Sequence, residues 1–295
     1  MALFRWRGAT STVWALGTNW VDGAGAAYLG ARYPGSIGAT FDDVLFDDSI
    51  TNSVAAYDAV AGGDEELLSF KVGADYNGTI ADGGQLKFQC NQATSSVIID
   101  GQSALQMNLD ISTTPEIIVL ASNTGIDIDG TVTSCYLYKG TITLNATLTI
   151  ATNFRVGYLS SQNSDVAATI AVGTTLPATI QAYGGTVTNN VALTTINIDG
   201  SQWTQAAGNI TTANINSGKL LWNGGTLTTA NVTGSGELTA ANETNPRTVT
   251  TINAYAQAII NLNNGVGGIT LGTGLNILST DVSITFPPNS TVTYT

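Results

Sequence analysis

Histidine is absent from this 295-residue sequence, and lysine and arginine together number only nine. Histidine is the commonest general base and the commonest metal ligand, so its absence excludes a Ser-His-Asp hydrolase and a zinc enzyme. The 21 aspartates and glutamates give a net charge of -12. Nine scattered cations form no patch that neutralises a run of phosphates, so we expect no nucleic-acid partner and no anionic membrane.

Cysteine is also scarce. Cys90 and Cys135 are the two cysteines of the chain, and with repeats of roughly 20 residues they would lie about two repeats apart. That separation exceeds comfortable disulfide reach, so we predict two buried thiols. No apolar run is long enough to span a membrane, and the first residues show no secretory signal. These absences favour a protein assembled in the cytoplasm and released on a particle, or a mature chain whose signal has been removed.

Charged residues make up only 10% of the chain. The surface must therefore be made soluble by Thr, Ser, Asn and Gly. Exposed helix faces usually carry Glu, Lys, Gln and Arg, whereas Thr, Ile, Val and aromatic residues favour strands, and Gly and Asn favour turns. The composition predicts an all-β protein.

A loose internal repeat gives the most specific signal. Three segments begin with Asn followed by Ile or Val and end at Gly, and the interval from one Asn to the next is the same both times: 197–200, 214–218 and 231–234. A period of about 20 residues, built from short β-prone runs and turns, is typical of a stacked solenoid. We therefore predict a parallel β-helix (β-solenoid).

The sequence suggests four segments. Residues 1–60 hold three of the five tryptophans and form an aromatic-rich capping and anchoring segment, and residues 61–85 form a Gly- and Asp-rich transition. The β-solenoid occupies residues 86–285. Residues 286–295 form a C-terminal cap or tail, because their two prolines cannot donate to a strand ladder. Strands of the solenoid are expected at 86–88, 97–99, 117–120, 136–138, 154–156, 179–181, 196–198, 214–215, 231–232 and 252–254.

The N-terminal segment also carries a recognisable spacing: Trp14, Asn19-Trp20, Pro34-Gly35 and Asp42-Asp43-Val44-x-Phe46. This spacing resembles the opening of bacterial surface β-helix repeat proteins and of some bacteriophage virion proteins. The resemblance ends near Phe46 and implies an aromatic, loop-rich entry segment ahead of the repeats. It provides no catalytic residue.

Carboxylate pairs are the catalytic chemistry that remains open to such a fold, since hydrolysis of a polysaccharide needs two acids about 5 to 9.5 Å apart. Asp127 and Asp129 are predicted on one strand face, with Asp100, Asp110 and Asp199 on other repeats. Asp100, Asp129 and Asp199 each lie in an Ile-Asp-Gly triplet, which is typical of tight corners. We favour the turn interpretation, and we expect a protein that is not an enzyme.

The acidic residues Asp42, Asp43, Asp47 and Asp48 are a candidate Ca²⁺ site, although their spacing matches neither an EF-hand loop nor a nine-residue calcium-binding repeat. A solvated acidic loop, or one paired with Arg5, Arg7 or Arg32, is the preferred alternative. We therefore predict no metal and no cofactor.

Candidate binding residues are aromatic and basic. Arg5, Trp6, Arg7, Trp14 and Trp20 are predicted to anchor the chain to a protein partner, because Trp and Arg dominate interface energetics. Two further tryptophans, Trp203 and Trp222, are separated by about one repeat. They would stack on neighbouring repeats, facing outward as a sugar platform or inward as core residues.

The leading functional hypothesis is a bacteriophage virion protein that decorates or cements the capsid. It would sit on the virion surface, bind the major capsid protein or another virion protein, and form a homo-oligomer, with a trimer favoured. A first alternative is a tail fibre or tailspike that binds or cleaves a host glycan. A second alternative is a bacterial surface adhesin.

Overall fold

A computed structural model describes most of the chain and divides it into two compact units, which are considered separately: residues 1–153 with 173–175, and residues 154–172 with 176–295. In the described residues the only helical element is the 3-10 turn η1 (Gly17–Asn19), and the regular structure is otherwise β-strand. The predicted all-β class is confirmed. The described residues are 2–8, 11–28, 32–36, 41–47, 53–58, 67–76, 78–90, 95–100, 107–121, 126–158, 166–240, 246–263 and 268–286.

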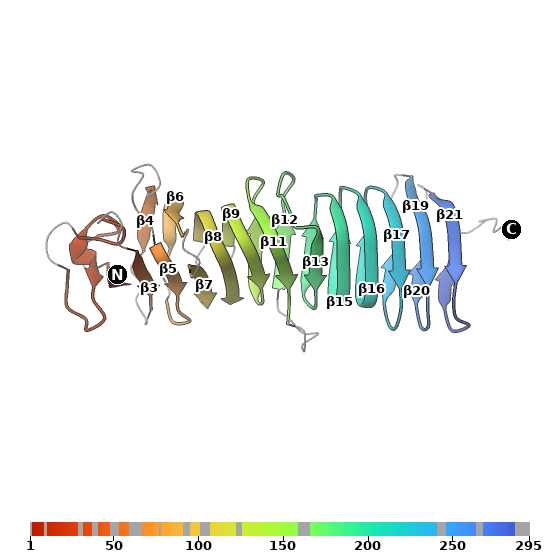
Figure 1. The fold of residues 1–295 in the computed structure, drawn as a ribbon, viewed down its shortest axis with the longest axis horizontal. Coiled ribbons are helices and arrows are strands. Elements are labelled where there is room, and N and C mark those ends of the chain that lie inside the picture. Colours follow the sequence, from red (N-terminus) through yellow and green to blue (C-terminus); the bar gives the residue numbers. More distant parts are fainter. Residues whose placement is uncertain are drawn as a thin grey trace. The chain divides into compact units, whose positions relative to one another are not determined.

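Unit 1 is a set of mainly parallel strands (Figure 1). Among its described pairings of named strands, only β1 with β2 is antiparallel. The unit boundary falls within its last strand, β11. Its strands are β1 (Leu3–Trp6), β2 (Trp20–Val21), β3 (Asp42–Phe46), β4 (Val54–Asp58), β5 (Leu67–Val72), β6 (Ile80–Gln89), β7 (Ser96–Asp100), β8 (Met107–Ala121), β9 (Ile126–Leu137), β10 (Gly140–Leu144) and β11 (Thr149–Val156).

Parallel pairing in unit 1 begins at its first strand. β1 pairs with β3, β3 with β5, and β5 with β7. Alternate residues of these strands are buried, so that Phe4, Val44, Phe70 and Val97 form one interior row. Parallel pairing therefore begins well before residue 86, where the sequence analysis placed the start of the solenoid. Unequal lengths of chain separate these strands, so the sequence shows no fixed spacing between them.

Unit 2 has a more regular arrangement, with β15, β16 and β17 lying side by side in chain order (Figure 1). All its described strand pairings are parallel. Its strands after β11 are β12 (Val166–Ile170), β13 (Thr179–Ala182), β14 (Thr186–Asn189), β15 (Leu193–Gln205), β16 (Ile210–Trp222), β17 (Leu227–Val232), β18 (Glu237–Thr239), β19 (Arg247–Ala254), β20 (Ile259–Asn261), β21 (Ile269–Ile277) and β22 (Ser283–Thr285).

The repeat of Asn seen in the sequence sets the strand register of unit 2. Asn197 pairs with Asn214, and Asn214 with Asn231, so the three predicted segments occupy equivalent positions. Residues on either side of each Asn point inward and are buried, as in the row that Ile198, Ile215 and Val232 form. The alternation of buried aliphatic and half-exposed polar residues fits a sheet with one face in the core.

The other sequence predictions for the fold have mixed outcomes. The predicted strands all fall within strands of the structure, except that β9 ends one residue before Tyr138. Cys90 and Cys135 are buried thiols, as predicted, and burial raises the pKa of Cys135 to about 12. Of the predicted C-terminal cap, Phe286 alone lies within the described residues.

Candidate functional site

The predicted anchor tryptophans form the core of the N-terminal segment. Trp6, Trp14 and Trp20 are almost completely buried. Trp20 meets both other rings edge to face, with centroids 4.9 Å from Trp6 and 4.7 Å from Trp14, and Phe46 joins the cluster from β3. The prediction that these indoles contact a partner is therefore corrected, because almost no indole surface is exposed.

Buried polar contacts fix the loop that carries these rings. The indole Nε1 of Trp20 donates to the Trp14 carbonyl at 2.8 Å. Asn19 is fully buried, and its Nδ2 donates to the Val13 carbonyl at 2.8 Å and to the Ser11 hydroxyl at 3.1 Å. A side-chain amide that forms hydrogen bonds with backbone groups in this way stabilises a segment that has little regular secondary structure.

The basic residues of the segment bind within unit 1. Arg5 donates to the Asp47 carboxylate, with Nε to Oδ2 at 2.9 Å, and Arg7 approaches the same carboxylate at 3.6 Å. Arg32 lies over the rings of Phe4 and Tyr28, 5.5 and 5.4 Å from their centroids. The expected pairing of an acidic residue with Arg5 and Arg7 is thus confirmed, because both guanidinium groups lie against the Asp47 carboxylate of the same unit.

The remaining acids of the candidate Ca²⁺ site point to different partners. Asp42 is buried and accepts the backbone N–H groups of Ala2 at 3.0 Å and Gly35 at 3.3 Å. Asp43, on the opposite face of β3, accepts a bond from the Ser69 hydroxyl. The predicted fourth member, Asp48, lies outside the described residues. In the part of the chain that the structure describes, no three acidic or thiol groups gather as metal ligands.

Asp42 should make stability depend on pH. Burial raises its pKa above the usual 3.8, although hydrogen bonds from Gly35 and Ala2 and the charge of Arg32 oppose the rise. A raised folded-state pKa contributes stability below the unfolded pKa, and that stability is lost as pH rises through the folded pKa. Asp42→Asn removes this loss, so the stability of the variant relative to the natural protein should increase as pH rises above 3.8 and through the folded-state pKa of Asp42. Urea unfolding of both proteins over a series of pH values measures this difference in stability, and a difference that stays constant would contradict the prediction.

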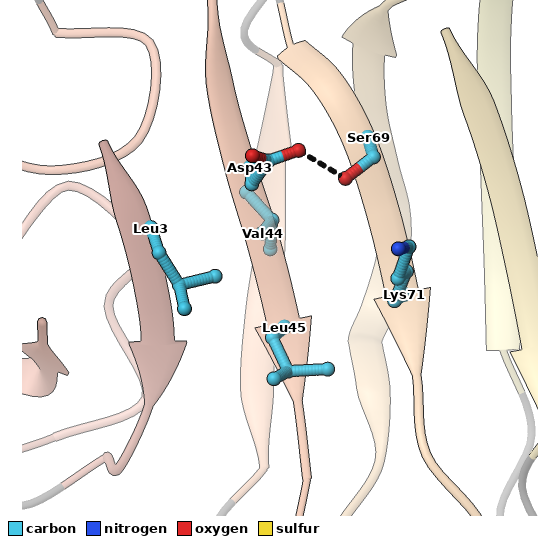
Figure 2. Close-up of a pocket in the computed structure, with 6 residues that line it drawn as sticks. All are labelled: Leu3, Asp43, Val44, Leu45, Ser69 and Lys71. Atoms are coloured by element: carbon cyan, nitrogen blue, oxygen red, sulfur yellow. Dashed lines mark hydrogen bonds between the residues drawn. The ribbon is translucent and has the colours of Figure 1, made fainter. Parts of the chain in front are cut away.

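A small hollow of about 280 Å³ lies on the outer face of β1, β3 and β5. Figure 2 shows Leu3 from β1, Leu45 from β3 and Lys71 from β5 around it, with the Asp43 carboxylate turned toward Ser69. Leu3 is 37% exposed. Leu3, Val44 and Leu45 give the hollow its apolar part, and Asp43, Ser69 and Lys71 give it a polar side with two charged groups.

Trp203 and Trp222 face the interior of unit 2, and both are fully buried. They do not stack on one another, because the register pairs Trp203 with Leu220 and Gln205 with Trp222. The Nε1 of Trp203 donates to the Gln205 carbonyl oxygen at 3.2 Å. The alternative in which both rings face the core is therefore confirmed, and the predicted glycan contact at Trp203 and Trp222 is wrong.

The candidate carboxylates of the Ile-Asp-Gly triplets are corner residues where the structure describes them. Asp129 accepts Nδ2 of Asn145 at 3.2 Å, and Asp199 accepts Nδ2 of Asn216 at 2.7 Å. The glycine after each has a positive φ, 98° and 139°, which favours glycine in a turn. These bonds join each corner to the next one. The side chains of Asp110 and Asp127 and the glycine after Asp100 lie outside the described residues.

The sequence analysis missed an uncharged face on the outer side of unit 2. Five asparagines form a continuous side-chain ladder across β15, β16, β17, β19 and β21, in which each Nδ2 donates to the Oδ1 of the preceding Asn at 2.7 to 2.8 Å: 197, 214, 231, 253 and 276. Two residues before the first four, Thr195, Thr212, Thr229 and Thr251 form a parallel column. The equal spacing of Asn197, Asn214 and Asn231 was the signal for the first part of this ladder, whereas the longer intervals to Asn253 and Asn276 gave none.

Aromatic residues lie at the β13 end of this face. Gln181 pairs with Asn197 on one side and with Arg155 on the other. Tyr183 is half-buried two residues beyond Gln181, and the Arg155 guanidinium lies 5.7 Å from its ring centroid. Tyr158, three residues beyond Arg155, is 46% exposed. Hydrogen-bonding amides and partly exposed rings therefore occur together in unit 2.

Comparison of the chain with protein-family models, with curated proteins and with solved structures gives no match. Among the described residues no helix is long and apolar enough to span a membrane.

Proposed function

We propose that this chain is a non-enzymatic structural protein of a bacteriophage particle, built as a parallel β-helix, that decorates or cements the capsid surface. The observation that carries the proposal is the strict register of unit 2, where Asn197 to Asn276 occupy one position in five successive repeats. Repeats that contact only their neighbours form extended, rigid scaffolds. The corner roles of Asp129 and Asp199 support a structural use of these carboxylates.

Attachment to the major capsid protein would use the outside of the N-terminal segment, since its tryptophans are buried. Leu3 and Val13 expose 37% and 49% of their surface, and Leu3 borders the hollow of Figure 2. An apolar surface beside polar groups suits a protein–protein contact. We retain the homotrimer as the expected assembly, in which several such contacts act together.

The experiment is a count of this chain in purified particles, by quantitative mass spectrometry against the major capsid protein. Capsid decoration requires hundreds of copies per particle, whereas a tail fibre would give a few to a few dozen. Leu3→Glu combined with Val13→Asp should reduce the count at least about tenfold, because each charge would be desolvated in the contact. Thr18→Asp, at another exposed position of the segment, is the control. Absence of the chain from particles would overturn the proposal.

A further inference from the structure

We propose that the outer face of unit 2 binds an extended, uncharged polysaccharide. The face consists of the Thr column, the Asn ladder, Gln181 and Tyr183, and it is called the ladder face below. The inference is independent of the proposed attachment to a capsid, because it rests on the chemistry of this face alone.

The ladder face presents repeating hydrogen-bonding groups. An Asn amide has two N–H donors and two acceptor lone pairs on its oxygen. The ladder uses one N–H and one lone pair of Asn214, Asn231 and Asn253. One donor and one acceptor per amide are not used by the ladder, and each Thr hydroxyl adds a group that both donates and accepts. Sugar hydroxyls are likewise both donors and acceptors, so the two sets match.

The absence of charged side chains from the Asn ladder and the Thr column favours a neutral polymer. The Asn ladder and the Thr column carry no charge over their whole length, in a chain with a net charge of -12. A nucleic acid or an anionic glycan would be repelled by the protein and would find no row of cations on this face. Arg155, beside Gln181, is the cation at its β13 end, and its guanidinium lies over Tyr183.

Aromatic rings supply the second, independent observation. Tyr183 is half-buried two residues beyond Gln181, and Tyr158, which follows the strand paired with β13, is 46% exposed. A sugar ring has an apolar C–H face and a rim of hydroxyls, so it suits an aromatic ring with amides beside it. Neither ring is part of the buried core, in contrast to Trp203 and Trp222.

The strand register makes the face rigid and periodic. Parallel strands lie about 4.8 Å apart, so equivalent side chains recur at that interval along the ladder. Each Asn is held by its neighbours, at 2.7 to 2.8 Å. Little side-chain freedom is therefore lost on binding, which favours affinity. An extended chain lying along the ladder would place successive sugars over successive repeats.

The test measures binding of the full chain to hydroxyethylcellulose, dextran and polygalacturonate by affinity electrophoresis and titration calorimetry. We expect binding to at least one neutral polymer, with affinity almost unchanged by added salt, and no binding to polygalacturonate. Tyr183→Ala should weaken binding about tenfold. The combined variant Asn214→Ala and Asn231→Ala should weaken it by a similar factor.

A matched control separates binding from folding. Gln202→Ala removes an exposed amide outside the ladder face. This variant should bind like the natural protein. If circular dichroism shows that the double Asn variant is unfolded, Thr212→Val replaces it, since valine preserves the shape and the strand preference. No binding to either neutral polymer, or full binding by Tyr183→Ala, would overturn the inference.

Discussion

Gly225→Ala should lower the free energy of unfolding of unit 2 by about 3 to 5 kcal/mol, a loss reserved for a few severe mechanisms. Gly225 has a φ of +73°, where an L-residue costs about 1 to 2 kcal/mol. A Cβ at this position would also lie 1.9 Å from the carbonyl oxygen of Gly208, in the turn between β15 and β16. That oxygen belongs to backbone, so the two turns would have to move apart and the neighbouring register would be strained.

Gly268→Ala is the matched control for this experiment. Gly268 belongs to the same unit and has a nearly identical φ of +70°, but among the described residues no atom lies within 4 Å of its added Cβ. It should lose only the conformational cost, about 1 to 2 kcal/mol. Urea unfolding followed by circular dichroism gives both values. Equal losses in the two variants would show that close stacking of the turns is not what requires glycine at position 225.

Part of the strand register of unit 2 could be predicted from its sequence. The interval from Asn197 to Asn214 equals that from Asn214 to Asn231, so the spacing of these residues gives the register of β15, β16 and β17 directly, whereas the longer intervals to Asn253 and Asn276 hide the register of β19 and β21. The aliphatic residues beside each Asn also locate the buried face. Sequence periodicity and strand register are here the same information.

Unit 1 could not be predicted equally well, because unequal lengths of chain separate its paired strands. The register pairs Leu3 with Asp43 and Asp43 with Ser69, so the chain between the first two partners is much longer than that between the second two. Connections of different length leave the strand spacing in the fold constant and remove the period from the sequence. Burial of the N-terminal tryptophans was missed for a related reason. Their partner Phe46 lies on a strand whose pairing with β1 no local pattern reveals.

The interior of unit 2 also contains a polar network that composition does not reveal. Gln205 is fully buried. Its carbonyl oxygen accepts Nδ2 of Asn189 at 2.8 Å and Nε1 of Trp203 at 3.2 Å, and its Nε2 donates to the carbonyls of Val191, at 2.8 Å, and Ala207. An amide that satisfies four groups at once fixes the turn after β15 to the turn before it. From sequence alone, Gln205 is indistinguishable from exposed Gln202.

Gln205→Leu should therefore cost about 3 to 4 kcal/mol, since leaving a buried donor or acceptor unsatisfied costs about 1 to 3 kcal/mol per group. Gln202→Leu makes the same chemical change three residues earlier at an exposed position, and it should change stability by less than about 0.5 kcal/mol. Denaturant unfolding measures both. A small loss for Gln205→Leu would mean that water or a shifted backbone satisfies the freed carbonyls.

A double-mutant cycle that combines Gln205→Leu with Asn189→Leu measures how much the contact between these two side chains contributes to stability. Asn189 donates both to Gln205 and to the Val191 carbonyl, the latter at 2.7 Å, so the two amides share one acceptor. Residues in one hydrogen-bond network typically show coupling energies of about 0.5 to 3 kcal/mol. We expect the double variant to be destabilised by less than the sum of the single losses, because the second substitution removes a group that the first left unsatisfied. Additive losses would show instead that each amide acts only on the backbone beside it, and that the contact between the two side chains contributes little.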